Sequence, residues 1–120
     1  MAESHRLAPC PSTPNCVSTE EPEAGKRMEP IPFSGAAQLA VKRLVEVIEG
    51  MTGGRVKQRE ALYVHAEFTS RVFRFVDDVD LVIDDEAKVV RFRSASRAGR
   101  WDLGANRRRM NELRRRFVGG

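Results

Sequence analysis

The segment between positions 94 and 107 holds a concentrated group of polar side chains that could bind a ligand. Two small hydroxyls, two arginines, a carboxylate and an amide are interleaved with glycines: Ser94, Ser96, Arg97, Asp102, Asn106 and Arg107. Hydroxyls, guanidinium groups and the free backbone N–H groups at the start of a helix together form a common kind of anion site. The glycine spacing fits neither the P-loop nor the dinucleotide-binding fingerprint. The pattern therefore indicates a site for an anion without identifying the anion.

Asp77 adds a carboxylate to this group through strand pairing. Pairing two predicted strands about the turn at 84–86 places Asp77 opposite Ser94, in a row of side chains that is otherwise apolar. A buried carboxylate without a partner would protonate or destabilise the fold. Arg97 and Arg107 are the nearest cations in the sequence, so we expect one of them to neutralise it.

A purely structural role for the same residues stays open. In that interpretation Asp102 caps a helix, the glycines permit a tight turn and Arg97 neutralises Asp77 inside the fold. An enzymatic role is a further alternative, in which a pocket around Asp77 and Arg97 uses the aspartate as an acid or base. No nucleophile stands near His65, so the sequence assigns no catalytic residue and no cofactor.

Cys10 and Cys16 are the two cysteines of the chain. Their spacing permits a local disulfide across a proline-rich loop, which would persist in an oxidising compartment. Reduced thiols packed as small apolar groups are the alternative that we favour for a cytoplasmic protein. Two cysteines with His5 or His65 would make an incomplete zinc site, so no metal is predicted.

Positive charge is concentrated near the C-terminus. Ten arginines and two acids lie between Arg91 and Arg116, whereas the remainder has an excess of four negative charges. Such a field attracts phosphate, nucleic acid or an acidic protein. Nucleic-acid binding through the last helix is an alternative, with Arg108, Arg109, Arg115 and Arg116 as the contacts. Aromatic residues that could stack on bases are not interleaved with these arginines, apart from Trp101, so we do not favour it.

The periodicity of apolar residues predicts the elements that position these groups. A 3,4 spacing predicts a helix near 35–49, capped by Ser34 and ended by Gly50, and the same spacing runs from Met110 to Phe117 in a second helix.

Between the helices the period changes to two. Alternation from 55 to 97 predicts four antiparallel strands in meander order, with Val79 opposite Phe92 in the last pair. The chain therefore reads as an α+β fold, a four-stranded sheet flanked by an N-terminal and a C-terminal helix. Residues 1–33 hold all six prolines and are expected to form an irregular arm that docks on a domain of residues 34–120.

Several motifs resemble the uncharacterised family known as domain of unknown function 1499. They are Cys10-Pro11-Ser12-Thr13-Pro14-Asn15-Cys16-Val17-Ser18, then Phe75-Val76-Asp77-Asp78-Val79, then Arg93-Ser94-Ala95-Ser96-Arg97 followed by Gly99, Asp102, Gly104, Asn106 and Arg107. The resemblance covers nearly the whole chain in order. It implies a family of bacteria and plant plastids without an established activity, whose members often carry an N-terminal membrane or export segment.

Composition limits the remaining possibilities. No stretch approaches the ~20 apolar residues of a membrane span, and the first residues lack the apolar core of a secretory signal, so we expect a cytoplasmic location. We therefore predict a small non-enzymatic domain that binds an anionic ligand or an acidic protein surface, with Arg97, Asn106 and Arg107 as contacts.

Overall fold

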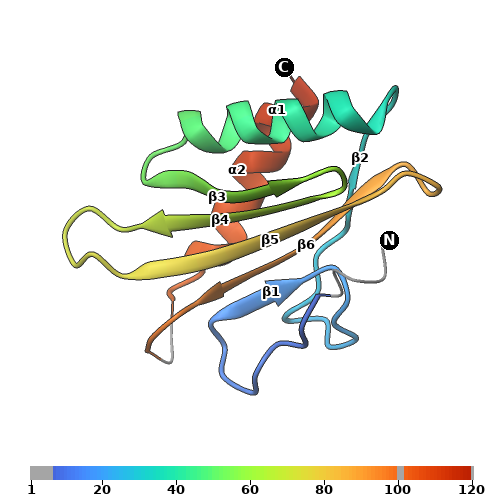
Figure 1. Cartoon of the computed structure of the whole chain (residues 1–120). Helices are drawn as coiled ribbons and strands as arrows, with labels where there is room; N and C mark the ends of the chain where they lie inside the picture. The colour runs from blue at the N-terminus through green and yellow to red at the C-terminus, as the bar shows by residue number, and fades with distance from the viewer. Residues whose placement is uncertain (1–6, 100–101, 120) are drawn as a thin grey trace.

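Two helices cover one face of an antiparallel sheet in the computed structural model, which describes residues 7–99 and 102–119 (Figure 1). In chain order the elements are β1 (Cys16–Ser18), β2 (Ile31–Pro32), α1 (Ala37–Gly50), β3 (Gly54–Glu60), β4 (Tyr63–Thr69), β5 (Val76–Asp84), β6 (Val89–Ser96) and α2 (Ala105–Gly119). The strands run in the order β1-β6-β5-β4-β3, and β2 pairs with the other end of β6. The α+β class is thus confirmed.

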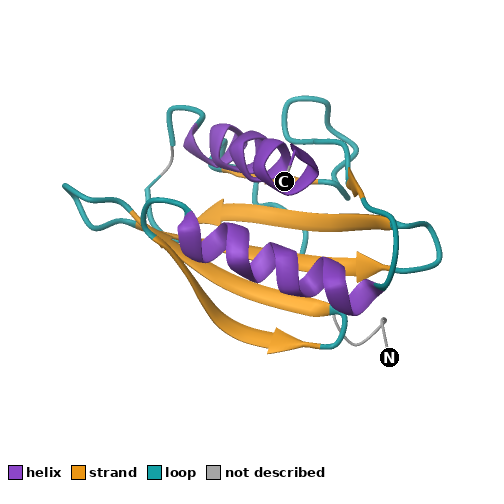
Figure 2. Cartoon of the chain, turned by 90° about the horizontal axis from the view of Figure 1, so that it is seen from above, coloured by secondary structure: helices purple, strands orange, loops and turns teal. Residues whose placement is uncertain are grey.

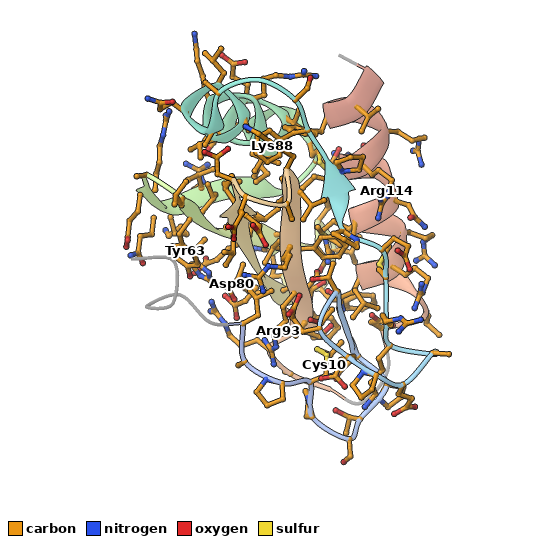
Figure 3. The ribbon with its side chains drawn as sticks, turned by 90° about the vertical axis from the view of Figure 1, so that its right-hand side faces the viewer. Cys10, Tyr63, Asp80, Lys88, Arg93 and Arg114 are labelled. Atoms are coloured by element: carbon orange, nitrogen blue, oxygen red, sulfur yellow. A yellow bond between two sulfur atoms is a disulfide. The ribbon has the colours of Figure 1, made fainter. Side chains whose placement is uncertain are left out.

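The sheet has six strands within the described residues, where the sequence predicts four. The two additional strands, β1 and β2, come from the proline-rich N-terminal segment and both pair with β6. They are three and two residues long, too short for alternation to reveal them. This segment runs beside β6, where Arg93 donates a hydrogen bond to the carbonyl of Pro9, close to Cys10 (Figure 3).

The register between β5 and β6 differs from the predicted one by two residues. Val79 pairs with Ser94, and Asp77 pairs with Ser96. The connection is four residues long, 85–88, because Asp84 pairs with Val89, and the carboxylate of Asp84 accepts the N–H of Ala87 within this turn. A shift of two residues keeps every side chain on its face, so Asp77 still points inward.

The ends of α1 also differ from prediction. Ser34 does not cap the helix, since Ala36 occupies that position without a side-chain hydrogen bond. Gly50 is the last helical residue, and the left-handed glycine comes three residues later at Gly53 (φ 76°). A Cβ atom at Gly53 would lie 2.3 Å from the carbonyl oxygen of Thr69, so only glycine fits where the chain turns into β3.

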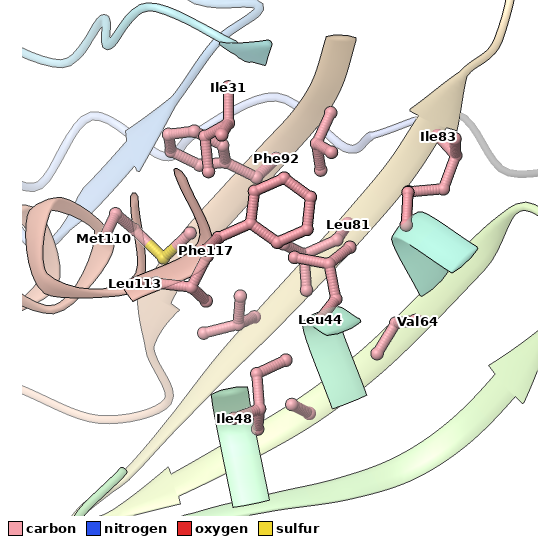
Figure 4. Packing of buried hydrophobic residues seen from close by; sticks show 14 of the residues in the cluster. Ile31, Leu44, Ile48, Val64, Leu81, Ile83, Phe92, Met110, Leu113 and Phe117 are labelled. Carbon is pink, nitrogen blue, oxygen red and sulfur yellow. The ribbon is translucent and has the colours of Figure 1, made fainter. Parts of the chain in front are cut away.

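The helices lie over one face of the sheet (Figure 2), its inner face, and the apolar core lies between the two layers. Side chains from α1, α2 and three strands make one cluster (Figure 4): Leu44, Ile48, Val64, Leu81, Ile83, Phe92, Met110, Leu113 and Phe117. The N-terminal segment contributes Ile31 and Met28 to the same cluster. The 3,4 spacing in the helices and the alternation in the strands therefore lead to a single apolar layer.

The two helices contain 14 and 15 residues, or roughly 21 Å and 22 Å of helix at 1.5 Å per residue. Neither they nor any other helix in the described part of the chain is long and apolar enough to cross a membrane.

Candidate functional site

Asp77 forms its ion pair with Arg109, which was predicted to lie among the outer arginines of the last helix and not at this site. Asp77 is 8% exposed, and Nη2 of Arg109 lies 2.6 Å from its Oδ2. The guanidinium also donates to Oδ1 of Asn106 at 2.9 Å and lies over the ring of Phe68, 4.9 Å from its centre. The expectation that Arg97 or Arg107 neutralises Asp77 is therefore wrong. Arg109 follows Asn106 by three residues, so helical spacing placed both on one face.

Asn106 is the centre of this polar cluster and is completely buried (0% exposed). Its amide nitrogen donates to Oδ2 of Asp102 at 2.6 Å and to Oγ of Ser96 at 3.1 Å. Its amide oxygen accepts from Oγ of Ser94 at 2.6 Å as well as from Arg109. The structure thus brings together five of the seven predicted site residues: Asp77, Ser94, Ser96, Asp102 and Asn106.

Asp102 caps the start of α2. Its carboxylate accepts the backbone N–H groups of Gly104 at 2.8 Å and Asn106 at 3.1 Å. Burial alone would raise the pKa of Asp102, but the hydrogen bonds from the side chain and backbone of Asn106 and from Gly104 outweigh it and hold the pKa below its ordinary value. The cap and the amide cluster therefore share one carboxylate.

Arg97 lies on the opposite face of the sheet. It donates to Asp78 through Nε (3.0 Å) and Nη2 (2.8 Å), and to Glu67 at 3.0 Å. These hydrogen bonds, first from Asp78 and then from Glu67, raise the pKa of Arg97 above its ordinary value. Strand alternation explains the position, because Ser96 points inward and its neighbour must point outward. No single pocket around Asp77 and Arg97 is therefore possible.

The outer face around Arg97 carries a second polar cluster. His65 Nδ1 lies 2.8 Å from Oδ1 of Asp80, which also accepts the hydroxyl of Tyr63 at 2.5 Å (Figure 3). Burial, and then the hydrogen bond to Asp80, raise the pKa of Tyr63 above its ordinary range. His65, Glu67 and Asp78 bring their ligand atoms within 4.8 Å of one another, a spacing that a divalent cation could bridge. Arg97 already donates to both of these carboxylates, so a guanidinium supplies the positive charge there.

Arg107 contacts the N-terminal segment. Its guanidinium donates to the carbonyls of Gly25 at 2.9 Å and Arg27 at 3.4 Å. It therefore lies away from Asp77 and holds the segment between β1 and β2 against α2.

Cys10 and Cys16 form a disulfide in the structure, so the prediction of reduced thiols is wrong. The loop that it closes presents Asn15 to the polar cluster. The carbonyl of Asn15 accepts the N–H of Ser96 at 3.0 Å and the amide of Asn106 at 3.2 Å. The disulfide loop is therefore bonded directly to the residues predicted to form the site.

A groove of about 520 Å³ opens beside the Asp77–Arg109 pair, between α2 and the turn that follows α1. Its lining consists of Met51, Thr52, Phe68, Ala105, Arg108, Arg109, Asn111, Glu112 and Arg115. Arg108 donates to the carbonyl of Leu103, and Glu112 is paired with Arg116 outside the groove. Arg115 has no ion pair within residues 7–99 and 102–119. Among the described residues, Arg108 and Arg115 therefore line the groove without an ion-pair partner, and Glu112, the carboxylate in the lining, is paired with Arg116.

The sequence matches a protein family over most of its length. A family model described as "Protein of unknown function (DUF1499)" matches residues 6–117, which confirms the resemblance drawn from the motifs. Neither the comparison with curated proteins nor the comparison with solved structures gave a match.

Proposed function

The chain belongs to the DUF1499 family of proteins of unknown function, so we propose its function from the arrangement of its own side chains. We propose a non-enzymatic binding module for an anionic ligand or an acidic protein surface, with the groove along α2 as the contact surface. The observation that supports this most is the pair of arginines, Arg108 and Arg115, that line the groove and form no ion pair with any described carboxylate.

The contacts in this proposal differ from those expected from the sequence. Arg97 is held by two carboxylates on the outer face, and Arg107 is held by backbone carbonyls. Arg108 and Arg115, which line the groove and have no ion pair among the described residues, therefore take their place as the anion-contacting groups. Guanidinium groups suit this role because they stay charged and bind carboxylate or phosphate through two parallel hydrogen bonds.

The buried cluster has a positioning role in this proposal. Asp77, Ser94 and Asn106 all bond to Arg109, which fixes its guanidinium at the base of the groove over Phe68. Ser96 and Asp102 in turn hold the amide of Asn106. A base that is held in this way gives the groove a fixed shape below Arg108 and Arg115, which lowers the conformational entropy lost when an anion binds.

Binding of a fluorescent glutamate-rich peptide and of inorganic phosphate, measured at low salt, tests the proposal. The R108Q/R115Q variant should bind the peptide about tenfold more weakly, since each charge pair at a surface is worth up to ~1 kcal/mol. The matched control is K42Q/R59Q, which removes two exposed charges that do not line the groove.

Equal affinities of the two variants would reject the groove as the contact surface. No binding of either probe by the wild-type chain would reject the proposed function itself. Weaker binding of both variants to the same degree would show a general effect of net charge, and would also reject the groove.

A further inference from the structure

The connection between β4 and β5 exposes apolar side chains to an unusual degree. Val72 is 81% exposed, Phe73 is 71% exposed and Phe75 is 60% exposed. They fall within four consecutive positions, with exposed Arg71 before them and exposed Arg74 between the two phenylalanines. Large apolar side chains grouped in this way on a surface mark a contact site more often than isolated ones do.

The loop presents these side chains in a defined conformation. The N–H of Ser70 donates to the carbonyl of Phe75, and the N–H of Phe75 donates to Oγ of Ser70, both at 2.9 Å. Arg74 takes a left-handed conformation (φ 60°) that completes the turn. The rings of Phe73 and Phe75 stack with their centres 5.6 Å apart, outside the core. The loop projects from one end of the molecule (Figures 1 and 2).

Cations outnumber acids in a hollow beside residues 71–75, the tip of this loop. A hollow of about 570 Å³ next to it is lined by four cations, Arg55, Lys57, Arg71 and Arg74, and by two acids, Glu49 and Glu67. Glu67 is already paired with Arg97. The tip therefore combines exposed apolar side chains with an excess of neighbouring cations.

We propose that residues 71–75 insert into the interfacial region of an anionic lipid bilayer, as a peripheral contact. The bilayer surface matches both parts of the tip, because phosphate groups and the first acyl carbons lie within a few ångströms of each other. Phe73 and Phe75 would lie among the acyl carbons, while Arg71 and Arg74 would bond to phosphates. An acidic protein surface would pair with the arginines but would not require three exposed apolar side chains among them.

The area of such a tip is small, so the contact is weak, reversible and dependent on lipid charge. This inference goes beyond the anion-binding groove and uses none of the groove's arginines. Either proposal can therefore fail while the other stands.

Co-sedimentation of the full chain with unilamellar vesicles tests the inference. The vesicles are phosphatidylcholine alone, or an equal mixture of phosphatidylcholine and phosphatidylglycerol. Wild-type chain should sediment with the mixed vesicles at low salt and much less with phosphatidylcholine alone. F73S/F75S should lower the partition coefficient about 100-fold, as expected for two apolar rings left in water. R71Q/R74Q should lower it about 25-fold on mixed vesicles, at roughly fivefold per charge.

The matched control is L39S. Leu39 is also 60% exposed, but it lies at the start of α1, at the opposite end of the molecule from the tip (Figure 1). The control should bind mixed vesicles like wild type, and far-ultraviolet circular dichroism should show that all variants fold.

Three results would overturn the inference. They are wild-type chain that stays in the supernatant, F73S/F75S that binds as tightly as L39S, and equal binding of wild type to both kinds of vesicle. Sedimentation velocity tests whether a second copy of the chain, and not a bilayer, binds to residues 71–75. A wild-type dimer that F73S/F75S dissociates, without vesicle binding, would assign the tip to self-association instead.

Discussion

The ion pair between Asp77 and Arg109 should be the most strongly coupled charge pair of the fold. The two side chains are 11% and 15% exposed, and their closest atoms are 2.6 Å apart. Removing one partner of a buried pair costs about 3–5 kcal/mol because the other charge is left without compensation. Since both side chains keep some contact with water, R109M should lower the free energy of unfolding by about 3 kcal/mol, at the lower end of that range.

A double-mutant cycle separates the ion pair from the packing of the arginine stem. D77N, R109M and the double variant are unfolded in urea, and a loss of about 3 kcal/mol corresponds to a midpoint shift of about 2 M for a domain of this size. The double variant should be more stable than the sum of the two losses predicts, by about 2 kcal/mol.

Arg97 and Asp78 provide the matched control on the other face. Their closest atoms are 2.8 Å apart, but Arg97 is half exposed, so solvent screens the attraction and the same cycle should give a small fraction of the coupling. A coupling between Asp77 and Arg109 no larger than that between Arg97 and Asp78 would refute the reasoning. It would show that burial does not strengthen the inner pair.

Two further predictions follow from the cap and the disulfide. C10S/C16S should lower the free energy of unfolding by ~2 kcal/mol, which is the chain-entropy value for so short a loop. Thermal unfolding of the variant and of the oxidised wild-type chain measures the difference, and equal melting temperatures would contradict the prediction. The pKa of Asp102 is lower in the folded state than in the unfolded chain, so its contribution to stability is present above the unfolded pKa and is lost as the pH falls through the folded pKa. D102N should therefore flatten the loss of urea resistance in acid, and acid sensitivity equal to that of wild type would count against the assignment.

Much of the layered fold could be predicted because its signals are periodic. The spacing of Leu44 and Ile48 and the alternation along β4 and β5 each arise from burial of one face. The same alternation placed Asp77 inward, even though the turn length put the register off by two residues. A register error of two residues leaves each side chain on its predicted face of the sheet, but it changes the residue that each one pairs with.

The candidate site was harder to predict because partner choice depends on three-dimensional register. Arg97 directly follows Ser96, the residue that pairs with Asp77. Because neighbouring side chains in a strand point to opposite faces, Arg97 lies on the outer face, where it bonds to Asp78. Arg109 comes from the first turns of α2, and its reach to Asp77 depends on how α2 crosses β5 and β6, which no local pattern specifies. Residue spacing alone could not show which arginine of this segment pairs with Asp77.

The disulfide and the short N-terminal strands were also beyond local patterns. Cys10 and Cys16 have a spacing compatible with either a bond or two thiols, and only the bend of the chain between them brings the sulfurs together. β1 and β2 have too few residues to show a period, and they exist because β6 offers free backbone groups along its edge.

The pairing of β1 with β6 has a consequence for how the protein is made. Cys16 pairs with Ala95, so residues 16–18 leave the ribosome well before the strand that they pair with. Contacts between such distant positions slow folding, because a long stretch must be ordered before they form. Until then the backbone of residues 16–18 stays open to other extended chains, so a protein halted in synthesis before β6 would be prone to mispairing.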